Sequence, residues 1–161
     1  MAVSEFRRDE FVISTDPARL DLDVIHEFLT NCYWAKGISR DVVARSIKHA
    51  LCFGIYDGSR AQVGFARVIS DFATIAYLGD VFVLKSHRGR GLSKWMMECI
   101  TQHPALQGLR RWILLTSDAH RLYAQFGFTA LKSAFHLAES PWPTFRGNTR
   151  NTGRADKLVG R

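Results

Sequence analysis

The residues His87-Arg88-Gly89-Arg90-Gly91-Leu92-Ser93-Lys94 join two segments of different periodicity. The apolar run at 74–84 before them is typical of a strand buried on both faces, and the spacing of apolar residues in 93–103 predicts a helix. The first N–H groups of a helix have no acceptor within it, and the helix dipole places positive potential at the same end. Glycines let the backbone approach an anion closely, and the basic side chains add full positive charges. The sequence therefore predicts a phosphate-binding turn between a strand and a helix.

Turn signals and periodicity define the elements on either side. Further strands are predicted at 11–13, 51–56, 62–69, 111–115, 128–131 and 134–137. Further helices are predicted at 22–32, after an N-cap at Ser39, and from an N-cap at Asp118 to a C-terminal stop at Gly127. The order β-α-α-β-β-β-α-β-α-β-β predicts an α/β (α+β) fold, in which about four helices pack on a mixed, mostly antiparallel sheet of about seven strands.

Bulk properties indicate a single soluble globular domain. The 161 residues suffice for one domain with its own core, and 47% of them are apolar. The start has no apolar segment typical of a signal peptide, and no apolar run is long enough to cross a bilayer. The cysteines, Cys32, Cys52 and Cys99, lack metal-ligand spacing. We therefore expect a cytoplasmic protein with no membrane partner and no metal site.

The formal net charge of +7 is unevenly spread along the chain. Residues 146–161 contain five basic side chains and one acid, Asp156, and so hold most of the excess. A charge excess confined to a polar terminus is weak evidence for nucleic-acid binding, which we regard as the less favoured interpretation. The expected organisation is a domain over 1–145 and a basic, solvated tail over 146–161.

Three phosphate-binding motifs compete for the turn. The P-loop pattern GxxxxGK[ST] is absent from the sequence. The dinucleotide fingerprint GxGxxG would have Lys94 at its third glycine. That motif also needs an acidic residue about 20 positions further on, and none lies between Glu98 and Asp118. A third motif fits the residues better.

Arg88 to Ser93 resembles the R/Q-x-x-G-x-G/A turn of the GNAT superfamily of N-acetyltransferases. The preceding strand, which ends at 80–83, and the later Tyr123-x-x-x-Gly127-Phe128 segment are similar to two further features of that family at matching spacing. The resemblance covers about residues 10–138 and implies a single GNAT-type domain. Two departures from the family pattern are Ser93, in place of the last Gly or Ala, and Asp118 or Ser117, where the family places an Asn.

The resemblance implies that acetyl-CoA is the cosubstrate. Its pyrophosphate would bind the backbone amides of the turn, which belong to Arg88, Gly89, Arg90, Gly91, Leu92 and Ser93. Arg88 and Arg90 would add electrostatic attraction. Asp118 would stand at a further cofactor contact, where its charge repels phosphate although its side chain can cap a helix. The pantetheine arm would pair, like an added strand, with the backbone of Val81 and Val83, with Phe82 between them.

The resemblance also implies direct transfer, with a donor for the oxyanion and a proton for the leaving thiolate. Tyr123 would be the general acid, since a phenol is protonated at neutral pH, although its helical spacing is equally typical of a core aromatic. Asp80 is the candidate base, directly or through water. The alternatives are a purely structural Asp80, a base at His120 or His136, or water alone.

Tyr33 and Trp34 lie between the first two predicted helices, in the loop that lines the acceptor site of the family. The same aromatics could instead anchor the loop to the core. The favoured function is acetyl transfer from acetyl-CoA to a primary amine of a small molecule or peptide. A non-catalytic acyl-CoA-binding regulatory module is the alternative, and a nucleotide or nucleic-acid binder is the third hypothesis. The sequence does not identify the acceptor, and it leaves a homodimer open.

Overall fold

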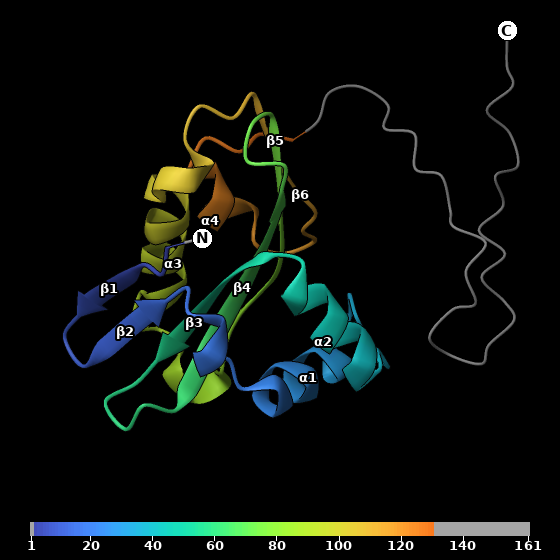
Figure 1. Ribbon diagram of the computed structural model, residues 1–161, viewed down its shortest axis with the longest axis vertical. Coiled ribbons are helices and arrows are strands. Elements are labelled where there is room, and N and C mark those ends of the chain that lie inside the picture. The colour runs from blue at the N-terminus through green and yellow to red at the C-terminus, as the bar shows by residue number, and fades with distance from the viewer. Residues whose placement is uncertain (1, 131–161) are drawn as a thin grey trace, which may run out of the picture. The chain divides into compact units, whose positions relative to one another are not determined.

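The computed structural model describes residues 2–130, which form a mixed six-stranded sheet with helices on both faces (Figure 1). The strands lie in the order β1-β2-β3-β4-β5-β6, and all neighbours are antiparallel except β5 and β6. The strands are β1 (Glu5–Arg8), β2 (Phe11–Ser14), β3 (Leu51–Tyr56), β4 (Gln62–Ser70), β5 (Ile75–Val83) and β6 (Arg111–Leu114). The helices are α1 (Leu22–Asn31), α2 (Arg40–Lys48), α3 (Leu92–Gln102) and α4 (His120–Ala124), with 3-10 turns η1 (Pro17–Arg19), η2 (Lys85–His87) and η3 (Pro104–Leu106). The predicted mixed, mostly antiparallel α+β fold is confirmed.

Helices α1 and α2 cover one face of the sheet, and α3 covers the other (Figure 1). The predicted N-cap of α2 is confirmed, because Ser39 Oγ accepts a hydrogen bond from Val42 N at 3.4 Å. Asp21 caps α1 in the same manner, accepting from Asp23 N and Val24 N. These side chains replace acceptors that the first turn of a helix lacks.

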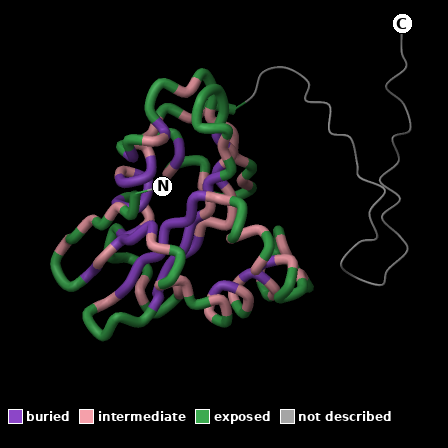
Figure 2. The backbone as a smooth tube through the Cα atoms, in the orientation of Figure 1, coloured by how far each residue is buried: buried purple, intermediate pink, exposed green. Residues whose placement is uncertain are grey.

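The two helical layers create two apolar clusters, with the central strands buried between them (Figure 2). The cluster beneath α3 includes Phe53, Ile55, Met96 and Ile100, all fully buried. The cluster beneath α1 and α2 includes Ile25, Leu29, Val43, Phe65 and Phe82. Burial of each such side chain contributes about 1.5–3 kcal/mol, so the sheet is held firmly from both sides.

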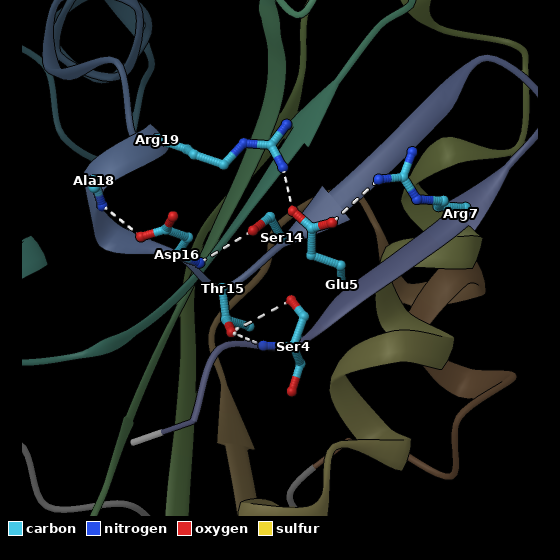
Figure 3. Close-up of polar contacts among 8 residues, drawn as sticks. All are labelled: Ser4, Glu5, Arg7, Ser14, Thr15, Asp16, Ala18 and Arg19. Carbon is cyan, nitrogen blue, oxygen red and sulfur yellow. Dashed lines mark hydrogen bonds and ion pairs between the residues drawn. The ribbon is translucent and has the colours of Figure 1, made fainter.

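The N-terminal strand β1 is an element that the sequence analysis did not predict. It pairs with β2, and at the open end of this hairpin Thr15 N donates to Ser4 O at 3.0 Å. Ser4 N also donates to Thr15 Oγ1 at 2.8 Å (Figure 3). Glu5 forms ion pairs with Arg19, from η1, and with Arg7 (Figure 3). Strand β1 is a charged edge strand, so it carries little of the apolar pattern by which strands are identified.

Three expectations for the strands need correction or lie outside the described residues. Residues 74–84 are not buried throughout, since Ile75 is exposed, and β6 is only half-buried because it ends the described sheet. Residues 128–130 form no strand. The predicted strand at 134–137, the domain boundary at 145/146, the tail at 146–161 and His136 lie outside the described residues. Within residues 2–130, no helix has the length and apolar character that a membrane crossing needs.

Candidate active site

The turn after β5 has the backbone that an anion cradle requires. Gly89 and Gly91 adopt left-handed φ values of 79° and 71°, and both are exposed. Gly91 is also the N-cap of α3, and no side chain caps that end. The first backbone N–H groups of α3, including those of Leu92 and Ser93, therefore have no intrahelical acceptor. The predicted strand–turn–helix is confirmed, and its free donors stand at the positive end of an 11-residue helix.

Basic side chains hold this turn in place by hydrogen bonds and ion pairs, and they also give it positive charge. Arg88 Nε donates to Val83 O at 3.0 Å, which ties the turn back to the end of β5. Arg90 Nη1 lies 3.5 Å from Glu10 Oε1. Arg8 Nη2 donates to Arg90 O at 3.2 Å, and the Arg8 guanidinium stacks 4.7 Å from the centroid of the Trp95 ring. The sequence analysis missed Arg8 because it missed β1.

Strand β5 separates from β6 just before the turn. The ladder between them runs only from Ile75↔Arg111 to Leu78↔Leu114, so among the described residues the β6-facing edge of 79–83 has no strand partner. Leu84 N donates to Val63 O at 2.8 Å, on the β4 side. Because main-chain groups alternate along a strand, those of Val83 and Val81 face the open side. Phe82 instead pairs with β4.

A β-bulge lies at the point of separation. Phe65 pairs with Phe82 and Arg67 with Gly79, so the single residue Ala66 on β4 faces two residues, Asp80 and Val81, on β5. Asp80 adopts φ 55°, which is uncommon for a residue other than glycine. The bulge turns the chain of β5 away from a regular ladder immediately before Val81.

The carboxylate of Asp80 is held by an arginine. Arg67 Nε donates to Asp80 Oδ2 at 2.6 Å, and both side chains are more than four-fifths buried. The pair lies on the α1/α2 side of the sheet, because Arg67 is two residues from Phe65 on β4 and so points to the same face as that buried side chain. The catalytic role predicted for Asp80 stays a prediction, and the structure adds a partner that the sequence analysis did not name.

Tyr123 lies on α4 and is almost fully buried. Burial raises its pKa to about 12, and the charges of Asp118 and Tyr33 act in the same direction. Its ring packs edge-on against Phe128, with centroids 6.0 Å apart. The phenol is therefore fully protonated at neutral pH, as a proton donor must be.

The expected cap of α4 by Asp118 is wrong. Thr116 Oγ1 accepts from Ala119 N at 3.0 Å and from Asp118 N at 3.4 Å, whereas the Asp118 carboxylate caps nothing and is exposed. Thr116 therefore holds the backbone of the residues that precede α4, and no side chain caps the helix itself. The cofactor contact predicted for Asp118 stays a prediction.

The aromatic loop after α1 links the two sides of the separation between β5 and β6. Tyr33 and Trp34 are 57% and 43% exposed, so neither side chain is buried in the core. Ser117 Oγ, which follows β6, donates to the Tyr33 hydroxyl at 2.6 Å. Trp34 packs against Phe28, which stacks on Phe82 of β5 with ring centroids 3.9 Å apart. The predicted acceptor loop therefore contacts Ser117 after β6 directly, through Tyr33, and is connected to β5 only through Phe28 of α1.

Among residues 2–130, no group of three or more His, Cys, Asp or Glu side chains is arranged to hold a metal ion. The cysteines in this part of the chain are reduced thiols, and burial raises the pKa of Cys52 to about 12 and that of Cys99 to about 11. Thiols with such pKa values are poor nucleophiles at neutral pH. The candidate site thus consists of the backbone edge of β5, the basic turn and the Arg67–Asp80 pair at the bulge, and Tyr123 of α4 is the candidate proton donor.

Comparisons with known proteins agree with this geometry. The sequence model of the acetyltransferase (GNAT) domain matches residues 48–130. A Gibberella zeae protein, FG08082, which is named as a proposed acetyltransferase, is 33% identical over an alignment of 140 residues, and the match covers 73% of this chain and 78% of that protein.

Solved structures show the same similarity. A crystal structure from Xanthomonas campestris pv. campestris, assigned to the GNAT family, is 54% identical, covers 77% of this chain and 87% of its own, and has a TM-score of 0.75. A structure from Clostridium acetobutylicum, determined with acetyl-CoA, has a TM-score of 0.59 at 13% identity. It covers 80% of this chain and 94% of its own, and shares the fold alone.

Proposed function

Because the chain belongs to the GNAT acetyltransferase superfamily, we propose that it moves an acetyl group from acetyl-CoA directly to a primary amine. The observation that carries this proposal is the separation of β5 from β6 after Leu78, directly before the glycine turn. An extended ligand can add to an open strand edge by main-chain hydrogen bonds. A pantetheine arm along Val81 and Val83 would place its pyrophosphate at the turn that follows.

The turn fits a pyrophosphate. Gly89 and Gly91 are exposed and left-handed. A Cβ at Gly89 would have no other atom within 4 Å, whereas one at Gly91 would lie 3.8 Å from Arg8 Nη2, so space is open beside Gly89 and a guanidinium borders Gly91. The free amides of α3 and the charges of Arg88 and Arg90 would all face the anion. Ser93, the departure from the family turn, is small and leaves the backbone accessible.

The chain would contribute three functions to the transfer. The N–H of Val81 would donate to the thioester oxygen, where negative charge develops. Tyr123 would supply a proton to the sulfur as the C–S bond breaks and the N–C bond forms, and would regain that proton from solvent. Asp80, or water beside it, would accept the proton that the amine nitrogen loses. The proton that the sulfur gains thus comes from Tyr123, and the proton that the amine loses goes to Asp80 or to water.

The raised pKa of Tyr123 keeps the phenol protonated at neutral pH but also makes it a weaker acid. With a pKa of about 12, the phenol holds its proton more tightly than an ordinary thiol does. Burial, however, raises the basicity of a departing thiolate for the same reason that it raises the pKa of the phenol. We therefore infer that the proton moves as the C–S bond breaks, within the buried site, rather than to a thiolate already in water.

The proposal is tested by ligand-dependent stability followed by turnover. We expect acetyl-CoA to raise the melting temperature, NAD and ATP to leave it nearly unchanged, and CoA to be released when a panel of primary amines is added. Stabilisation by NAD without stabilisation by acetyl-CoA would overturn the cofactor assignment. Tight acetyl-CoA binding with no CoA release from any amine would favour the non-catalytic acyl-CoA-binding module.

A further inference from the structure

A second polar region lies on the α1/α2 side of the sheet, between α2 and β4. It is an open depression of about 410 Å³. Its lining residues come from those two elements: Val42, Arg45, Ser46, His49, Arg67 and Ile69. None of them is acidic, and two are arginines. The depression therefore combines an apolar wall with basic groups.

The two arginines have guanidinium N–H donors that their hydrogen bonds in the described chain do not use. Arg45 is exposed, and within residues 2–130 it forms no ion pair and no side-chain hydrogen bond. Arg67 bonds Asp80 through Nε alone, which leaves its Nη groups unused in the described chain. A guanidinium has five N–H donors, so a single contact to Asp80 leaves most of the capacity of Arg67 available.

The depression is close to the proposed reaction site. Arg67 is opposite Gly79 on β5, and Val81 lies two residues further along that strand. Because the bulge sets both Asp80 and Val81 opposite Ala66, the residue next to Arg67, Val81 lies diagonally across the strand pair from Arg67. An amine at Val81 could therefore place a second group, a few bonds away, against Arg67 and Arg45.

We propose that the acceptor is a primary amine that also carries an anionic group, a carboxylate or a phosphate, and that this anion binds Arg45 and Arg67 in the depression. The aliphatic part of the acceptor would lie against Val42 and Ile69. Arginine suits both anions, because its planar fork of donors matches the spacing of carboxylate and phosphate oxygens. This inference rests on the proposed function, since it assigns the acceptor of the same reaction.

Paired amines give the first test. Leucine would be compared with leucinamide, and phosphoethanolamine with ethanolamine, by CoA release in the presence of acetyl-CoA. We expect at least one anionic member to exceed its neutral partner by about tenfold in kcat/KM, the factor expected for one charge-assisted hydrogen bond. The carboxylate and phosphate pairs distinguish the two anions. Equal kcat/KM within both pairs would overturn the proposal.

Arg45→Gln gives the second test, with Lys48→Gln as its matched control. Lys48 is an exposed cation on the same helix but does not line the depression. Arg45→Gln should raise the KM of the anionic amine about tenfold, with kcat, the KM of acetyl-CoA and the rate with the neutral amine unchanged. Lys48→Gln should change none of these. Equal effects of the two variants would show a general charge effect and contradict the proposal.

A binding measurement keeps this inference separate from the proposed function. Isotope-labelled protein would be titrated with acetate and with inorganic phosphate, and backbone amide shifts followed by NMR. We expect saturable shifts at Arg45, Ser46 and His49 with at least one anion, and their loss in Arg45→Gln. Absence of these shifts would overturn the inference even if acetyl-CoA binds. Their presence without acetyl-CoA binding would instead overturn the proposed function.

Discussion

Arg67 on β4 and Asp80 on β5 form an ion pair of 2.6 Å across the bulge at which β5 leaves its regular ladder. Asp80 holds φ 55° at this point, an unfavourable conformation that costs of order 1 kcal/mol for a residue other than glycine. The ion pair offsets that cost. It also links the backbone beside Val81 to the strand that lines the basic depression.

A double-mutant cycle tests the link between these two residues. We expect Arg67→Gln and Asp80→Asn each to lower the free energy of unfolding by about 2 kcal/mol, because each leaves a mostly buried charge without its partner. The double variant should lose less than the sum, with a coupling energy of at least about 1 kcal/mol. The free energy of unfolding of all four proteins is measured by chemical denaturation, and additive losses would contradict an energetic coupling between Arg67 and Asp80.

The glycine turn is tested by Gly89→Ala. An added Cβ would meet no other atom, so its effect is conformational, through the φ of 79°. We expect a loss of about 1 kcal/mol in stability and acetyl-CoA binding weakened about tenfold, measured by calorimetry. Gly58→Ala is the control, since a Cβ there makes only an ordinary 3.5 Å contact with Glu10. Equal acetyl-CoA affinity in both variants would argue against the turn as the pyrophosphate site.

Arg8 is expected to support the turn from β1. Its guanidinium bonds the carbonyl of Arg90 and stacks on Trp95, so Arg8→Gln should weaken acetyl-CoA binding several-fold. Arg7→Gln, the neighbouring exposed cation that pairs with Glu5, should leave binding unchanged. Titration calorimetry at two salt concentrations separates the specific loss from a change in net charge, which would affect both variants alike.

Stability is expected to fall in mildly acidic solution because of His103. The ring is buried, its Nε2 lies 3.2 Å from Ser4 Oγ, and burial lowers its pKa. The unfolded chain therefore binds this proton more readily than the folded one. The free energy of unfolding should decrease as the pH falls through about 6.5, the ordinary value for histidine, towards the lowered folded value.

Denaturation midpoints at several pH values check this expectation. His103→Gln should flatten the dependence between about pH 7.5 and 5.5, whereas His120→Gln, at an exposed position, should keep it. A wild-type slope that survives in His103→Gln would assign the effect to another group.

The apolar pattern was sufficient to predict much of the sheet. Strand β3 begins and ends where predicted, at Leu51 and Tyr56, and β4 extends one residue beyond its predicted end. Both strands are central, so tertiary burial and local pattern agree. Strand β1 was missed because Glu5–Arg8 is charged and obtains its order from pairing with β2.

The site was predicted in its local parts and missed in its non-local ones. The turn and the helix that follows it are encoded by adjacent residues, and the structure has both. The Arg67–Asp80 contact depends on the register of β4 and β5 and on a bulge, which no spacing in the sequence reveals. Helix α4 begins at His120 with Ala119 as its N-cap and no side-chain cap, so Asp118 lies one position too early for the capping role that its residue type suggests.

The direct test of the account is the turnover of Tyr123→Phe, with Tyr56→Phe as a control. Both tyrosines are buried, and burial raises the pKa of each to about 12, but the Tyr56 hydroxyl lies outside the site and has no hydrogen-bond partner among the described residues. With the best amine of the panel, Tyr123→Phe should lower kcat about 100-fold and leave acetyl-CoA affinity within about twofold. Tyr56→Phe should alter neither. An unchanged kcat in Tyr123→Phe would contradict its role as the proton donor.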